Sequence, residues 1–170
     1  MMTIPLVTQL RFTRREFERV LAGISAEHGE KRLLPINSIG WTVGHIANHE
    51  QWCWVVTGQK KLVRELAPLF ANGAPASTPP LAEMVSAWRE ITAAADPFLD
   101  TLTEADLGVH WLGADGEPVR ENVGVMFHRL IYHYWFHIGE IHAARQLLEG
   151  GELPQFVGDM DVIAPLYWAS

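Results

Sequence analysis

Two pairs of histidines are the strongest sign of chemistry in the sequence. His45 and His49 form one pair and His133 and His137 the other, and a spacing of four residues places both members of a pair on one face of a helix. A ring buried among apolar side chains needs partners for its nitrogens, and one divalent metal ion can serve rings from two helices. The spacing predicts either a metal centre or ordinary core histidines that bind backbone carbonyls and carboxylates.

Two carboxylates follow these histidines closely. Glu140 lies one turn after His137 and Glu50 just over one turn after His45, so either could orient a ligand or accept a proton as a base. For Glu50, a solvated carboxylate or one paired along its own helix is the favoured interpretation. Glu140 is our candidate for the catalytic base, because its position keeps it beside the expected metal.

Three further side chains are weaker candidates. Arg145, eight residues after His137, could bind an anionic group of a substrate, although an arginine in such a position more often pairs with an acid at the edge of the core. His49 could contact the substrate or close the metal site as a fourth ligand. Cys53 could be a soft ligand or a nucleophile, but a small buried hydrophobic side chain is the favoured interpretation.

Four long helices are predicted to position these residues, because apolar side chains recur at helical spacing in four segments. Gly29 is expected to stop the first helix, and Pro97 to kink the third before it resumes. The predicted ranges are residues 6 to about 27, about 39–56, 81–102 and about 122–149.

The segments between the helices complete the predicted fold. The stretch from Ala67 to Pro80 is too long for a tight turn, so it forms a crossover or a lid between the second and third helices. Residues 109–119 indicate a small hairpin around an Asp-Gly turn. The expected fold class is therefore all-α, a four-helix bundle in one domain over residues 1–170, with an apolar tail at 152–170 that packs back along the bundle.

Composition excludes several classes of protein. The chain carries 20 acidic and 13 basic side chains, a formal net charge of −7, and no basic run longer than Lys60-Lys61, so no binding to nucleic acid or to an anionic membrane is expected. No apolar stretch reaches the length of about 18 residues that a membrane-spanning helix needs. The single cysteine cannot form an internal disulfide and the first residues lack a signal-peptide pattern, so we expect a cytoplasmic protein.

The fourth predicted helix is apolar on nearly every side. His128, Trp135 and His142 fall on the side opposite His133, so a second segment must cover that face. The tail of the chain or a second subunit could do so, and we expect a homodimer.

Two motifs in the predicted helices resemble those of the DinB-like superfamily, and of its YfiT-like metal-dependent hydrolases in particular. The motifs are Gly44-His45-Ile46-Ala47-Asn48-His49-Glu50 after Trp41, and His133-Tyr134-Trp135-Phe136-His137-Ile138-Gly139-Glu140 followed by Ala144-Arg145-Gln146. The resemblance implies a four-helix bundle in which one histidine of the second helix and the HxxxH pair of the fourth bind a divalent metal, zinc or nickel. Carried onto this sequence, the ligands are His45, His133 and His137.

The same resemblance implies a metal-dependent hydrolase or a thiol-dependent transferase that acts on a small molecule, with a low-molecular-weight thiol as a possible co-substrate. Three imidazoles leave at least one coordination position open, which is typical of a catalytic site and lowers the pKa of a bound water towards about 7. The alternative is a non-catalytic, dimeric interaction module, metal-binding or stress-associated, whose metal is structural. An open position lined by polar groups favours the enzyme, and a fourth ligand from His49 favours the module.

Overall fold

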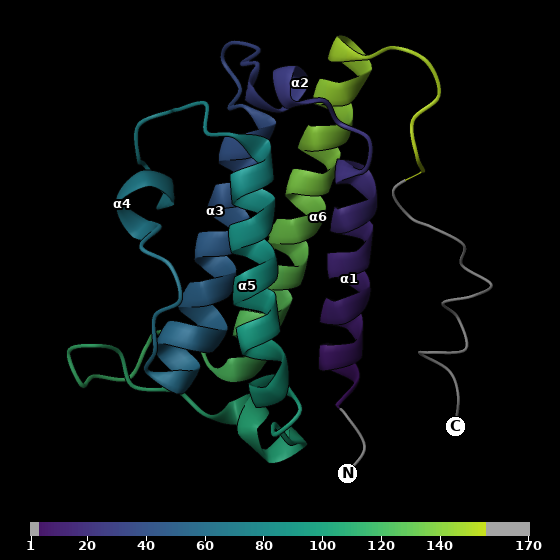
Figure 1. The fold of residues 1–170 in the computed structure, drawn as a ribbon. Helices are drawn as coiled ribbons and strands as arrows, with labels where there is room; N and C mark the ends of the chain where they lie inside the picture. The colour runs from purple at the N-terminus through teal and green to yellow at the C-terminus, as the bar shows by residue number, and fades with distance from the viewer. Residues whose placement is uncertain (1–3, 156–170) are drawn as a thin grey trace.

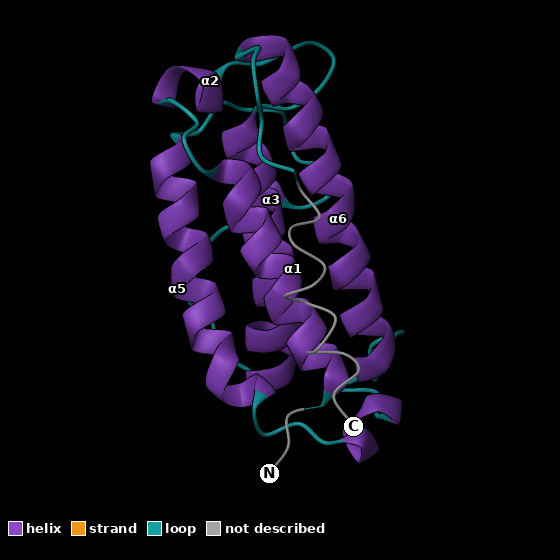
Figure 2. Cartoon of the chain, turned by 90° about the vertical axis from the view of Figure 1, so that its right-hand side faces the viewer, coloured by secondary structure: helices purple, strands orange, loops and turns teal. Residues whose placement is uncertain are grey.

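Four long helices lie side by side in the computed structural model, which describes residues 4–155 (Figures 1 and 2). They are α1 (Pro5–Leu21), α3 (Ile39–Gln51), α5 (Leu81–Leu99) and α6 (Val123–Leu148). The shorter elements are α2 (Ala26–Glu30), the π-helical segment η1 (Trp52–Thr57) that continues α3, α4 (Ala67–Phe70) and the 3-10 segment η2 (Glu104–Gly108). Residues 4–155 contain helices and no strand, so the predicted all-helical fold class is confirmed.

The apolar faces of the four long helices meet in one core. α3 packs on α5 and α1 packs on α6, while α3 also contacts α6. Phe17 of α1, Trp54 of η1 and Tyr134 of α6 are among the largest fully buried side chains. Burying each such aromatic side chain removes a large apolar area from water, which is the main force that holds the helices together. The contact between α3 and α6 is the one that carries the two histidine pairs.

The predicted starts of the second and fourth long helices are confirmed. The Ser38 side chain accepts a hydrogen bond from the Trp41 amide at 3.2 Å, and the Asn122 side chain accepts one from the Val125 amide at 2.9 Å. Each bond satisfies an amide that has no partner in the first turn of a helix. At its far end α6 stops before Gly150, which has a positive φ of 64°.

Two predicted helix ends were wrong. The first long helix ends at Leu21 rather than near residue 27, because Gly23 takes a positive φ of 80° and Ser25 caps the separate helix α2. The third helix does not resume beyond a kink: it runs without a break through Pro97 and ends two residues later. A proline lacks the amide that would donate a backbone hydrogen bond. In the last turn of α5 this removes one bond close to the end of the helix, so the helix does not break there.

Two connections between helices were predicted, a long crossover or lid and a small hairpin, and the structure forms the hairpin only in part. The long connection between α3 and α5 contains α4, which stands beside α3 (Figure 1). At the expected hairpin the chain forms one isolated antiparallel bridge between Leu112 and Pro118, with the Gly113 amide donating to the Glu117 carbonyl at 2.7 Å. The turn is present, but no strand extends from it. Most of the predicted tail, from residue 156 onward, lies outside the described residues.

Among the described helices, none combines the length and the apolar character that crossing a membrane requires.

Candidate metal centre

The contact between α3 and α6 brings His45, His133 and His137 together. Nε2 of His133 lies 3.1 Å from Nε2 of His45 and 2.8 Å from Nε2 of His137. One nitrogen from each ring falls within 4.8 Å of the other two, and among the described residues these three form the group that could hold a metal ion. The three histidines predicted as ligands therefore share one site.

The outer nitrogens of two of these rings are held by acceptors. His45 Nδ1 lies 2.7 Å from the carbonyl oxygen of Phe70, and His137 Nδ1 lies 2.6 Å from Oε2 of Glu140. A carbonyl or carboxylate oxygen accepts a hydrogen bond, so each ring carries its proton on Nδ1 and leaves the lone pair of Nε2 directed at the cluster. This is the arrangement in which protein histidines bind metals, with an acceptor behind each ring to fix its tautomer.

The third ring is held by the extra histidine. Nδ1 of His133 lies 2.6 Å from Nδ1 of His49, so one of these two nitrogens carries the proton that they share. When His133 is the donor, its Nε2 has a free lone pair and all three inner nitrogens face one another as acceptors. His49 thus lies behind a ligand, against the nitrogen that faces away from the cluster.

These residues fit a divalent metal. Three converging lone pairs repel one another unless a cation lies between them, and neutral imidazoles suit zinc or nickel equally well. Nitrogens bound to zinc at 2.0–2.1 Å in a tetrahedral site are about 3.3 Å apart, close to the spacings found here. Removing one outer acceptor would free a ring to rotate, so the acceptors behind the rings also contribute to metal affinity.

Burial keeps the imidazoles of His45, His49 and His133 neutral. It lowers the pKa of His133 to about 3 and that of His49 to about 4, with smaller contributions from the neighbouring histidines and from Arg129. Burial also lowers the pKa of His45, partly offset by its bond to the Phe70 carbonyl. A neutral ring is the form that binds a metal, so at neutral pH His45 and His133 need not lose a charge-bearing proton before a metal binds.

The histidine cluster lies at the wall of a cavity of about 460 Å³. This volume lies within the range of small-molecule sites in proteins. The described residues that line it are His45, His49 and His133 together with Asn48, Trp52, Ala71, Asn72 and Arg129. A ligand in the cavity would therefore lie against the cluster.

The long connection helps to build this site. Phe70 at the end of α4 is 2% exposed and supplies the carbonyl that holds His45, while the Trp41 ring stacks on His45 with 5.0 Å between centroids. A Cβ at Gly44 would lie 2.7 Å from the Phe70 ring, so only glycine lets α4 approach α3 this closely. The segment predicted as a crossover or lid thus contributes the buried Phe70 to the site, and its Ala71 and Asn72 line the cavity.

Other predicted candidates have different partners. Arg145 is buried, donates to the Val20 carbonyl at 2.7 Å and pairs with Glu149 at 2.8 Å, which ties the ends of α1 and α6 together. Cys53 is fully buried, and burial raises the pKa of its thiol well above the ordinary value. Cys53 is thus the small buried side chain that was favoured, and Arg145 pairs with an acid.

The favoured interpretation of Glu50 was wrong. Its side chain is fully buried and forms an ion pair with Arg14, while the Tyr134 hydroxyl donates to its second oxygen at 2.6 Å. The Trp88 indole donates to the Tyr134 oxygen at 2.6 Å, and Arg14 also pairs with Asp96 at 2.8 Å. This network joins all four long helices beside the histidines. Its signal in the sequence was an arginine and a glutamate on the apolar stripes of two helices.

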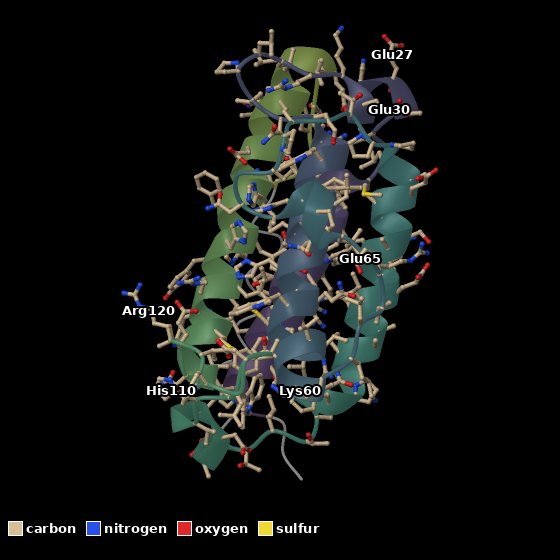
Figure 3. All side chains as sticks on the ribbon, turned by 90° about the vertical axis from the view of Figure 1, so that its left-hand side faces the viewer. Glu27, Glu30, Lys60, Glu65, His110 and Arg120 are labelled. Atoms are coloured by element: carbon tan, nitrogen blue, oxygen red, sulfur yellow. The ribbon has the colours of Figure 1, made fainter. Side chains whose placement is uncertain are left out.

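Two other histidines, His28 and His110, lie away from the cluster. His110 is exposed and its Nδ1 lies 3.0 Å from the Val119 carbonyl, at the end of the bundle opposite Glu27 and Glu30 (Figure 3). His28 lies 3.8 Å from Glu149. Neither belongs to the three-histidine group.

Comparison with known protein families identifies the chain. The profile of the DinB superfamily matches residues 9–141, which include both histidine motifs. The chain belongs to the DinB superfamily. A search of curated proteins found no match. Membership of the DinB superfamily and the three-histidine group are both compatible with metal binding.

Proposed function

We propose that this DinB superfamily protein is a metal-dependent enzyme, a hydrolase or a thiol transferase, with His45, His133 and His137 as ligands of zinc or nickel. The single observation that carries the proposal is that the inner nitrogens of His45, His133 and His137 meet, and that two of these residues, His45 and His133, line a 460 Å³ cavity. When bound, such a metal lowers the pKa of a water or thiol and supplies the corresponding anion near neutral pH.

In this proposal, neighbouring residues of the chain orient the three ligand rings. Phe70, His49 and Glu140 orient the three rings through their outer nitrogens. The sequence left two possible roles for Glu140, orienting a ligand or accepting a proton as a base. Its 2.6 Å contact with His137 favours the orienting role, in which the carboxylate strengthens the ligand that it touches.

The alternative is a structural metal closed by a fourth ligand. His49 is the residue that would supply this fourth ligand, but its Nδ1 faces the outer nitrogen of His133. The arrangement therefore supports the open, catalytic site over the closed one.

A cobalt-substituted protein tests the proposed function. Cobalt reports changes in its ligands through its visible spectrum, so we expect 2-mercaptoethanol to change that spectrum near pH 7 if a coordination position is open. The change should saturate with thiol concentration and be absent when His133 is replaced by alanine. A cobalt spectrum that does not respond to thiols or small anions would assign the protein to the structural-metal class.

We also propose a homodimer formed through α6. The expected apolar face at Trp135 is half-buried and packs on Phe12, with 6.0 Å between ring centroids. On α6 the exposed Phe, Tyr or Trp side chains are instead Tyr132 and Phe136, which are 64% and 63% exposed on successive turns. Large exposed aromatic side chains that lie close together are typical of contact surfaces.

Sedimentation equilibrium tests the dimer. The wild-type chain should sediment as a dimer at micromolar concentration, and replacing both Tyr132 and Phe136 with serine should give a monomer with unchanged helix content. Leu69 on α4 is similarly exposed at 57% and provides the control, because its replacement by serine should leave the dimer intact. A monomeric wild-type protein would reject the proposal.

A further inference from the structure

The cavity beside the histidines differs in charge from the rest of the chain. The protein has a formal net charge of −7, yet among the described residues that line the cavity there is one cation, Arg129, and no carboxylate. A cavity wall with a positive charge and no negative one favours anions over neutral or cationic molecules.

Arg129 is placed to act on a ligand of the histidine cluster. It lies one turn before His133 on α6, and its charge contributes to the lowered pKa of both His133 and His49. Glu121 forms an ion pair with its Nη2 atom, and the Arg129 side chain remains 52% exposed. A guanidinium group has five N–H donors in a planar fork, so one ion pair leaves donors for an anion.

The other walls of the cavity supply neutral polar and aromatic groups. Asn48 comes from α3, and Asn72 from the connection after α4. Trp52, at the start of η1, is 37% exposed. The two amides can donate to anion oxygens, and the indole offers a flat surface for the body of a small organic molecule.

We propose that the substrate of this site is a small organic anion, whose charged group binds Arg129 and whose body lies against Trp52, with Asn48 and Asn72 completing its hydrogen bonds. The inference rests on the proposed function, because it takes this cavity as the substrate pocket of the three-histidine centre. Arg129 is then a specificity-determining residue. The cluster holds the reacting end of the substrate and Arg129 selects its charge.

Benzoate and benzamide form a matched pair of probes, since they share size and shape and differ in charge. We expect the wild-type protein, loaded with zinc and studied by calorimetry at low ionic strength, to bind benzoate more tightly than benzamide. Replacing Arg129 with glutamine should weaken the binding of benzoate about fivefold to tenfold. The effect is modest because a charge-assisted hydrogen bond at a half-exposed site contributes less free energy than a buried one. Benzamide binding should not change, and added salt should weaken benzoate alone.

Two further variants sharpen this test. Replacing Arg129 with lysine keeps the charge and removes the planar fork, so benzoate should weaken by less than in the glutamine variant. Arg120, which points away from the helices (Figure 3), is the control. Its replacement by glutamine should leave benzoate binding at the wild-type value.

The outcomes separate this inference from the proposed function. Equal affinity for benzoate and benzamide, or an unchanged benzoate affinity after Arg129→Gln, would overturn the inference even if the protein holds one zinc per chain. A protein that takes up no zinc at the histidines would overturn the proposed function. Benzoate binding that still depends on Arg129 in metal-free protein would then support the anion site alone.

Discussion

Replacing His133 with alanine is expected to abolish stoichiometric metal binding. His133 is the central member of the cluster, because its Nε2 contacts the Nε2 atoms of both His45 and His137. Loss of a residue that only orients a ligand typically weakens metal binding by about 10–100-fold, and loss of a ligand itself should exceed this range. The measurement is metal content and chelator competition on protein purified without a metal-binding tag.

His49 provides the decisive comparison for this prediction. Its contact is with the outer nitrogen of His133, so His49→Ala should retain one metal per chain with an affinity reduced by roughly 10–100-fold. His128, which is exposed on the same helix, serves as the control and should not change the affinity when replaced. If His49→Ala loses its metal as completely as His133→Ala, His49 is a ligand and the assignment of the site is wrong.

That the two histidines of α6 share a face could be predicted because helical spacing is a local property of the sequence, whereas the choice of His45 as the third candidate ligand rested on the family resemblance. His133 and His137 lie four residues apart, and this places them on one face of α6 whatever else the fold does. The partners behind the rings could not be predicted in the same way. The carbonyl of Phe70 has no side-chain signal, and it reaches His45 only because the long connection folds back onto α3.

The helix ends also depend on contacts between distant segments, which the local sequence does not predict. Gly29 was predicted to end the first helix, but Gly23 lies six residues before it, and a backbone preference alone does not distinguish the two glycines. Gly23 takes the positive φ, whereas a Cβ at Gly29 would lie 2.6 Å from the Leu81 side chain. Gly29 is therefore required by the close approach of α2 to α5, a contact between segments far apart in the sequence.

Glu50 shows where the sequence carried a usable signal. Ile46, Glu50 and Cys53 follow one another at helical spacing on one face of the second long helix, and all three are fully buried. Arg14 occupies an equivalent place between Leu10 and Phe17. An acid and a base on the core faces of two helices predict a buried ion pair, because a single buried charge without a partner is too costly.

Replacing Glu50 with alanine is expected to have the largest effect on stability. It leaves the Arg14 guanidinium buried without its main counter-ion, and removing one partner of such a pair costs about 3–5 kcal/mol of unfolding free energy. Arg14 keeps Asp96 at 2.8 Å, so the loss should lie near the lower end of this range. Urea unfolding followed by circular dichroism measures the change.

Variants of the residues that contact Glu50 show how much of the lost unfolding free energy comes from each contact. Tyr134→Phe removes only the hydroxyl that donates to Glu50 and accepts from Trp88, so it should cost about 1–3 kcal/mol. Replacing Arg14 with methionine and Glu50 with leucine together should cost less than Glu50→Ala alone, because no charge is left unpaired. The exposed pair of Arg64 and Glu90 is the control, and Glu90→Ala should lower the free energy of unfolding by no more than about 1 kcal/mol.

The same variants link stability to the metal centre. Glu50 and Tyr134 directly follow His49 and His133 along the chain, so the bond between their side chains helps to hold the two histidine-bearing helices in register. Tyr134→Phe should therefore weaken metal binding in protein that is still fully folded, whereas Glu90→Ala should not. If Glu50→Ala unfolds within 1 kcal/mol of the wild-type protein (roughly the worth of an exposed pair), the network contributes little to the fold. The histidines would then be positioned by apolar packing alone.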